Sequence, residues 1–317
     1  ESEPLDRLKR YFYRNDTYKK VVSDHPIIIL VGNKGVGKSA MFKISISEEK
    51  SKGNLPILIK PDDIAELGEG DENFLLKIRQ WKYGLIKIIG SKVFREFGIN
   101  EDKPGALSSS VNSLKENQNL LPSQQLLIDN FLKNKKIVVY IDDLDRGWEG
   151  KRSDINRLSA LLNSVRDLSN ENPGLCFKIS LRTDVYFSIR NTDESSDKIE
   201  GSVIWYSWTE HEILSMLSKR ILTFMGIPVA EDDLKSMPLE DLARYLDHIF
   251  EATFLGYGKW ENQPMYKVLL SLIRKRPRDI VKLCTLAARE AQRTGSGQIC
   301  TSHFINIFEE YSHGRMQ

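Results

Sequence analysis

Residues 32–39 have the types and the spacing that bind the phosphates of a nucleotide. They match the pattern GxxxxGK[ST] at every position, with Gly32, Asn33, Lys34, Gly35, Val36, Gly37, Lys38 and Ser39. Glycines let main-chain N–H groups wrap around a phosphate, and the N-terminus of a following helix adds positive potential. Lys38 would then reach the β- and γ-phosphates, and Ser39 would offer its hydroxyl to Mg²⁺. We therefore expect a phosphate site over these residues and Ala40; the alternative is a glycine-rich turn that binds no ligand.

A second chemical signal lies roughly 100 residues further along, where an apolar run ends in two acids. Ile137–Ile141 predicts a buried strand, and Asp142 and Asp143 follow it directly. At the carboxyl end of a parallel strand, Asp142 is expected to hold Mg²⁺ through water. Asp143 beside it is expected to polarise an attacking water. The alternative is that Asp143 or Asp145 caps the N-terminus of a helix.

Five short apolar segments predict the strands that would position these residues. They are Ile27–Val31 just before the glycine-rich loop, then Leu55–Ile59, Ile137–Ile141, Leu175–Leu181 and Val203–Tyr206. Helical patterns separate them, with apolar residues every three or four positions from Phe74 to Phe97 and over Ile155–Leu168. Strands that alternate with helices predict an α/β fold with a parallel sheet.

The remaining segments predict helices and one loop. Residues 5–22 form a basic and aromatic helical lead, and residues 100–123 are rich in Ser, Asn, Gln and Pro, which indicates a surface loop. Beyond Trp208 only helical patterns occur. We therefore expect a nucleotide-binding α/β domain over residues 1–208 and an all-α domain over residues 209–317.

Composition excludes several classes of protein. The 317 residues include 46 basic and 44 acidic side chains, so the net charge of +2 excludes a histone-like polycation. An apolar content of 40% can fill a core, and apolar runs of five residues are too short to cross a membrane. The three cysteines form no CxxC pair. The first residues contain no apolar signal segment and no initiator methionine, so we expect a cytoplasmic protein and a trimmed chain.

The acidic motif also resembles a known family. Asp142-Asp143-Leu144-Asp145-Arg146 is similar to the DDLDR signature of KAP-type P-loop ATPases, relatives of the STAND and AAA+ groups. Further similar segments, shared with soluble bacterial ATPases of the origin-recognition type, are Arg182–Tyr186, Asp193–Gly201 and Arg276–Asp279. The resemblance covers most of residues 10–312 and implies a P-loop NTPase sheet of the ASCE or AAA+ kind, followed by a helical lid. Such proteins commonly continue past the lid.

This resemblance implies roles for three arginines and a preference for ATP. Arg182, after the fourth strand, would sense the γ-phosphate, and the alternative is an ion pair with Asp184. Arg190 would act as an arginine finger toward a neighbouring subunit, since its own phosphate site offers its charge no evident partner; the alternative is a charge that favours the helix end. Arg278 would close on the nucleotide from the lid, and the alternative is a solvated turn. Aromatic residues before the first strand would sandwich adenine or simply pack: Tyr11, Phe12, Tyr13 and Tyr18.

Two functions fit these features. The first is a Mg²⁺-dependent ATPase that works as a switch or an oligomeric motor, with an effector partner or fused effector. Many bacterial relatives resemble parts of phage-defence modules, so the resemblance implies an antiviral role. The second is a DNA-binding or DNA-loading module in which ATP stabilises the bound state. Its candidate face for nucleic acid contains Arg274, Lys275, Arg276, Arg278, Lys282, Arg289 and Arg293. A solvated helix face is the alternative, and no membrane partner is expected.

Overall fold

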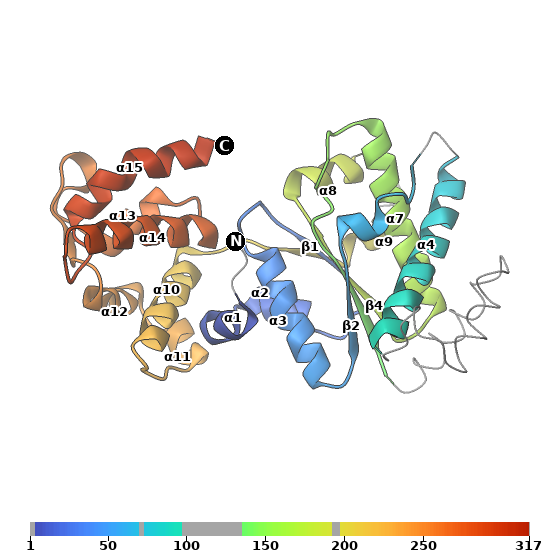
Figure 1. Ribbon diagram of the computed structural model, residues 1–317, viewed down its shortest axis with the longest axis horizontal. Coiled ribbons are helices and arrows are strands. Elements are labelled where there is room, and N and C mark those ends of the chain that lie inside the picture. Colours follow the sequence, from blue (N-terminus) through green and yellow to red (C-terminus); the bar gives the residue numbers. More distant parts are fainter. Residues whose placement is uncertain (1–3, 70–72, 97–134, 192–196, 317) are drawn as a thin grey trace. The chain divides into compact units, whose positions relative to one another are not determined.

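The computed structural model describes residues 4–69, 73–96, 135–191 and 197–316 (Figure 1). The surface loop expected between Asn100 and Ser123 lies outside these residues. None of the helices in these ranges combines the length and the apolar content that a bilayer span requires.

Five strands form one parallel sheet, as the sequence predicts. They are β1 (Ile27–Val31), β2 (Leu55–Ile59), β3 (Ile137–Ile141), β4 (Leu175–Leu181) and β5 (Val203–Trp205). Their order is β2-β3-β4-β1-β5, so β4 lies between β1 and β3, while β2 and β5 form the edges. The first four strands have the expected bounds, and the fifth ends one residue early, at Trp205. The expected α/β fold class, a parallel sheet flanked by helices and followed by a mainly helical region, is confirmed.

The two faces of this sheet differ in chemistry. On one face, odd-numbered side chains of β3 and β4 pack with α4 (Phe74–Glu96) and α7 (Arg152–Glu171) in one apolar cluster. Trp81, Leu85 and Leu161 in that cluster are fully buried. The even-numbered side chains face α3 (Lys38–Ser51), where the ring of Phe42 meets that of Tyr140 at 5.2 Å. Figure 1 shows α3 on one side of the strands and the α4–α7 pair on the other.

Shorter helices complete the part of the chain around the sheet. They are η1 (Pro61–Ile64), α8 (Thr183–Arg190) and α9 (Asp197–Glu200). The helix expected over 155–168 begins earlier, at Arg152, because the Asp154 carboxylate accepts the main-chain N–H of Lys151 at 3.1 Å and closes the first turn.

The helical lead expected over residues 5–22 is two helices, α1 (Leu5–Tyr11) and α2 (Asp16–Val21). The chain is extended at Phe12, with φ −67° and ψ 126°. The buried Asn15 then accepts the N–H of Tyr18 at 3.1 Å through its side-chain oxygen, as a helix cap does. The predicted helical character of this segment is confirmed, and the Asn15 cap divides it into two helices.

After β5 the described chain is mainly helical. Its helices are α10 (Glu210–Phe224), α11 (Glu231–Ser236), α12 (Leu239–Arg244), η3 (Leu246–His248), η4 (Gly258–Trp260), α13 (Met265–Leu272), α14 (Pro277–Arg293) and α15 (Thr301–Met316). The prediction of helices only is wrong, because β6 (Thr253–Phe254) and β7 (Gln263–Pro264) pair in an antiparallel ladder. Strands of two residues are too short to produce an alternating pattern in the sequence.

Contacts group the chain into two compact units. One contains Lys20–Gly32 and Met41–Trp205, which include the sheet. The other contains the residues up to Lys19, the segment Asn33–Ala40 and the residues from Tyr206 onward. The segment Asn33–Ala40 therefore belongs to the same unit as the residues from Tyr206 onward. The expected domains, 1–208 and 209–317, stay a prediction.

Candidate nucleotide-binding site

The glycine-rich segment leaves the carboxyl end of β1 and opens α3 at Lys38. The Gly32 N–H donates to the Leu181 carbonyl at 3.1 Å, which continues the β1–β4 pairing by one residue. Gly35 and Gly37 have φ angles of 89° and 102°, in the left-handed region that residues with a side chain rarely adopt. These glycines let the segment turn sharply between β1 and α3.

Two donors from the C-terminal helical region hold carbonyls of this loop. The indole Nε1–H of Trp208 donates to the Val36 carbonyl at 2.8 Å, in a buried contact. The main-chain N–H of Arg278 donates to the Gly35 carbonyl at 3.3 Å. A Cβ added to Gly35 would lie 3.3 Å from the Cβ of Arg278, so the two segments are in close contact. The structure therefore brings Arg278 to the loop.

The loop also contains internal contacts. The Lys38 ammonium group donates to the Asn33 carbonyl at 3.3 Å, and the Val36 N–H approaches the same oxygen at 3.4 Å. Lys38 is half-buried, whereas Ser39 and Lys34 are exposed. The Lys38 side chain therefore contacts the main chain of its own loop, at Asn33.

Asp142 follows β3 and is half-buried. Its carboxylate accepts a short hydrogen bond from the hydroxyl of Ser180 on β4, the neighbouring strand. Its main-chain N–H donates to the Ile59 carbonyl at 3.4 Å. Gly32 and Asp142 follow the carboxyl ends of β1 and β3, which are strands of one parallel sheet, so both residues leave the sheet at the same end of its strands.

Asp143 differs from Asp142 in exposure and backbone. It is exposed, has a φ angle of 64°, and pairs with Arg146 at 2.8 Å. A non-glycine residue in this region stores conformational strain, which clusters at functional sites. The next helix is α7, nine residues on, so helix capping by Asp143 or Asp145 is wrong as an alternative.

The arginines of the fourth strand and its helix are both paired. Arg182 donates to Asp184 through Nε at 3.0 Å and through Nη2 at 2.6 Å, and it lies 3.4 Å from Asp145. The ion pair considered as the alternative to a phosphate sensor therefore exists. Arg190 ends α8 and pairs with Glu200 at 2.6 Å. Its charge has a partner outside the loop and the acidic turn.

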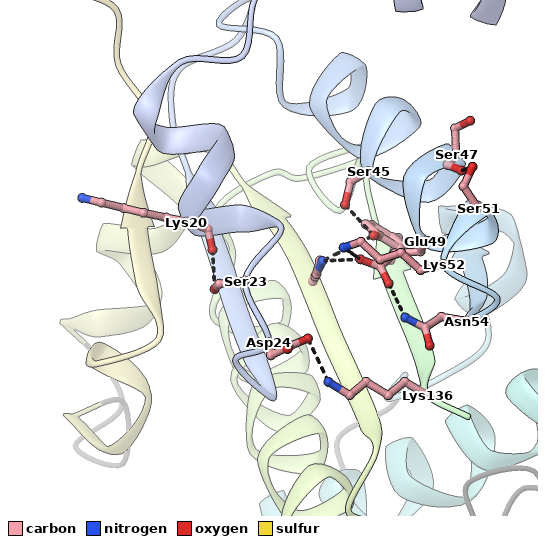
Figure 2. Close-up of polar contacts among 12 residues, drawn as sticks. Lys20, Ser23, Asp24, Ser45, Ser47, Glu49, Ser51, Lys52, Asn54 and Lys136 are labelled. Carbon is pink, nitrogen blue, oxygen red and sulfur yellow. Dashed lines mark hydrogen bonds and ion pairs between the residues drawn. The ribbon is translucent and has the colours of Figure 1, made fainter. Parts of the chain in front are cut away.

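A buried polar cluster lies where α3 crosses β3 and β4, and Figure 2 shows its α3 side chains. The Ser45 hydroxyl is 2.6 Å from the phenol of Tyr140, and Glu49 accepts from Asn54 at 2.7 Å and from Lys52 at 3.2 Å. Lys178 lies 3.8 Å from Glu49. Burial lowers the pKa of Lys178 and raises that of Tyr140. Tyr140 and Lys178 pair across the strands two residues before Asp142 and Ser180.

The aromatic residues before β1 are packed. Phe12 and Tyr18 meet edge to face at 5.2 Å, and Tyr13 lies 6.3 Å from the ring of Trp208. All three are buried, and burial raises the pKa of Tyr13 to about 12. These contacts fit the packing alternative.

Sequence reasoning missed Ser180 and Trp208. A serine inside an apolar strand is a detectable signal, but its partner depends on the register of β3 and β4, which the sequence does not reveal. Trp208 is 172 residues from the Val36 carbonyl that it contacts, and only the folded chain brings them together.

Comparisons with known proteins give distant matches. No family model matches the chain. A protein of Escherichia coli K12 named after transposon gamma-delta, with a mass of 80.3 kDa, is 21% identical over 275 residues. That match covers 71% of this chain, and the chain spans 39% of the length of the E. coli protein.

Solved structures with a similar course of the chain include three proteins of archaea and bacteria. The Walker-type ATPase PABY2304 of Pyrococcus abyssi has a TM-score of 0.48, 14% identity, and coverage of 96% of this chain and 74% of its own. The Aeropyrum pernix ORC1 protein in complex with DNA has a TM-score of 0.49 and 12% identity, and the match covers 94% of this chain and 65% of that protein. Domain III of the Thermotoga maritima replication initiation protein DnaA has a TM-score of 0.46 and 12% identity, and the match covers 98% of this chain and 99% of that domain.

Proposed function

We propose that this chain binds ATP together with Mg²⁺ and hydrolyses the γ-phosphate bond. The observation that carries the proposal is a complete GxxxxGK[ST] segment with left-handed glycines at 35 and 37, directly between β1 and the N-terminus of α3. Main-chain N–H groups, a helix N-terminus and the Lys38 ammonium group suit a polyphosphate. The resemblance favours ATP over GTP. The sequence also contains no NKxD motif, which is the segment specific for guanine.

The donor set also fits Mg²⁺. Ser39 at the start of α3 and the half-buried Asp142 supply oxygen ligands, directly or through water. Bound Mg²⁺ neutralises charge on the phosphates. In this proposal Lys38 neutralises the β- and γ-phosphates, Asp143 orients and deprotonates the attacking water, and Arg182 and Arg278 contact phosphate oxygens.

Arg182 can contact a phosphate only if it leaves one of its ion-pair partners, Asp184 or Asp145. A guanidinium that contacts Asp184 and Asp145 must exchange at least one of those contacts for a phosphate oxygen. Arginine binds phosphate and carboxylate in the same bidentate geometry and with similar strength, so the new contact offsets the free energy of the contact that is lost.

At a finer level, we propose that the chain is a cytoplasmic switch or oligomeric motor of the KAP, STAND or AAA+ kind, working with an effector in anti-phage defence. The DDLDR segment supports this proposal. Arg190 would reach the γ-phosphate of a neighbouring subunit after leaving Glu200, and a guanidinium supplied in trans accelerates hydrolysis on the order of 10³-fold or more.

The test of the proposed function is ATP turnover per subunit, measured against protein concentration. We expect turnover that needs Mg²⁺ and rises with concentration. Arg190→Ala should keep ATP binding and lose turnover, and mixing it with Lys38→Ala should restore part of the activity. A wild-type protein that neither binds nor hydrolyses ATP contradicts the whole proposal, whereas turnover independent of concentration rejects only the trans role of Arg190.

A DNA-binding module is the second candidate function. Exposed basic side chains cluster before and along α14: Arg274, Lys275, Arg278, Arg289 and Arg293. Two of them form ion pairs, Lys275 with Glu210 at 3.5 Å and Arg293 with Glu290 at 2.7 Å. The transposon name of the E. coli relative adds support. Binding of duplex DNA that weakens steeply with salt, with a slope lowered by Arg274→Ala, would favour this function.

A further inference from the structure

The Trp208 indole and the Val36 carbonyl form the best-defined contact of the glycine-rich loop. The nitrogen–oxygen distance is 2.8 Å, Trp208 is 6% exposed and Val36 is 3% exposed. A buried carbonyl without a donor costs free energy, so this bond strongly favours one orientation of the Val36 carbonyl.

The orientation of that carbonyl determines the orientation of an N–H group in the loop. In a planar trans peptide, the carbonyl of one residue and the N–H of the next point in opposite directions. The Val36 carbonyl and the Gly37 N–H belong to the same peptide unit. When the carbonyl points at the Trp208 indole, the Gly37 N–H points away from it.

The left-handed backbone of Gly37 belongs to the same arrangement. Rotation of the Val36–Gly37 peptide changes ψ at Val36 and φ at Gly37, where φ is now 102°. A Cβ added to Gly37 would lie 3.6 Å from the Tyr206 hydroxyl, an ordinary contact. Space therefore does not demand glycine at this position, but the φ angle does.

The indole itself is held in place by its neighbours. Its ring lies 5.8 Å from that of Tyr206 and 6.3 Å from that of Tyr13. The next residue, Thr209, caps α10 through a reciprocal pair of hydrogen bonds with Glu212, at 3.1 Å and 2.8 Å. Trp208 is thus a rigid donor fixed to the start of a helix.

We propose that Trp208 is a positioning residue for phosphate binding, which holds the Val36–Gly37 peptide with the Gly37 N–H turned toward the bound phosphate. This inference rests on the proposed function. Loop N–H groups contact phosphate in the ground state and in the transition state alike, so loss of the indole donor weakens nucleotide binding without slowing the chemical step.

The test compares Trp208→Phe with the matched control Trp205→Phe. Phenylalanine keeps an apolar ring at position 208 but removes the donor. Trp205 is a tryptophan of the same segment that is 48% exposed, and its ring packs on Tyr186 and Phe187. We expect Trp208→Phe to raise both the Kd for Mg·ADP and the KM for ATP about tenfold, with kcat within about twofold. Trp205→Phe should leave both constants unchanged.

A purely structural role predicts a different pattern. It would lower the melting temperature and reduce kcat through loss of active protein, with KM unchanged. That pattern, or wild-type nucleotide affinity in Trp208→Phe, overturns the positioning role. A wild-type protein that fails to bind Mg·ADP would instead remove the proposed function, so the wild-type titration separates the two failures.

Gly37→Ala provides a second, independent measurement. Its Cβ has room among the surrounding protein atoms, so within the chain the substitution acts through the φ angle and the resulting rotation of the same peptide. We expect this variant to remain folded, as judged by circular dichroism, and to weaken Mg·ADP binding at least tenfold. When combined with Trp208→Phe it should add little, because both changes act on one peptide. Full additivity of the two effects in a folded double variant would overturn the inference.

Discussion

The glycine-rich loop and the acidic turn Asp142–Arg146 follow the carboxyl ends of two strands of the same sheet, β1 and β3, but they are held in different ways. The loop is fixed through main-chain carbonyls, which accept from Trp208 and from the Arg278 N–H. The acidic turn is held through side chains, with Asp142 bonded to Ser180 and Asp143 to Arg146. Ligand binding at the acidic turn would require the carboxylates to exchange partners, and in the loop it would require the Lys38 ammonium group to leave the Asn33 carbonyl.

This difference decides how sensitive each region is to substitution. In the loop, the proposed chemistry depends on the glycine φ angles and on one lysine, so we expect few changes to be tolerated. In the acidic turn, each carboxylate has a protein partner that limits the effect of a single change. We therefore expect larger losses from substitutions in the loop than from substitutions in the acidic turn.

Lys38→Ala should lower ATP turnover about a thousandfold or more, because it removes the charge that neutralises the β- and γ-phosphates. Lys43→Ala is the matched control, since Lys43 is a lysine of the same helix, α3, that lies outside residues 32–40. Steady-state phosphate release and nucleotide binding measure both variants. Wild-type values in Lys38→Ala would show that residues 32–39 are only a turn.

Asp143→Asn should slow hydrolysis about a hundredfold and leave ATP binding intact, because an amide cannot take the proton of the attacking water. Asparagine adopts left-handed backbone readily, so the φ angle of 64° is preserved and the effect is chemical. Single-turnover hydrolysis with pre-bound ATP measures it. Unchanged hydrolysis would assign Asp143 to the Arg146 ion pair alone.

Asp142→Asn should raise the Mg²⁺ concentration for half-maximal activity about tenfold, with a smaller change at saturating Mg²⁺. The Ser180 hydroxyl can still donate to the amide oxygen, so the fold at the strand end persists. Activity titrated with Mg²⁺ measures the shift. If Asp142→Asn and Asp143→Asn exchange these behaviours, the order of ligand and base is reversed.

Beneath the acidic turn, Glu49→Gln should destabilise the fold by about 2–3 kcal/mol, because it leaves the buried Lys178 without its carboxylate. Lys178→Met should change stability by less than about 1 kcal/mol, because an apolar side chain at this buried position needs no ionic partner and Glu49 keeps Lys52 and Asn54. Urea unfolding monitored by circular dichroism measures both. Equal losses would show that the Lys178–Glu49 pair is a net source of stability.

The sequence predicts what depends on local pattern. The bounds of β1, β2, β3 and β4 follow from apolar runs with clear ends, and the loop follows from its eight-residue motif. These features are determined by residues close together in the chain. They needed no knowledge of register or packing.

Features that depend on distant residues were not predictable. The bond from Ser180 to Asp142 requires the strand register, and the bond from Trp208 to Val36 requires the helical region to fold against the loop. The break between α1 and α2 arises from a cap at Asn15 in a segment that otherwise has a helical pattern. The β6–β7 ladder is too short for any periodicity to be detected.

The two edges of the sheet have a consequence for the behaviour of the chain before folding is complete. β2 contains Pro56, which has no N–H to offer an added strand, and β5 has only three residues. Parallel sheets form slowly, because their contacts join distant segments, so partly folded chains expose their edges for longer. Edges interrupted in this way are poor templates for pairing with another chain. We therefore expect refolding at high protein concentration to proceed with little edge-to-edge aggregation, and replacing Pro56 by Val to increase the aggregated fraction.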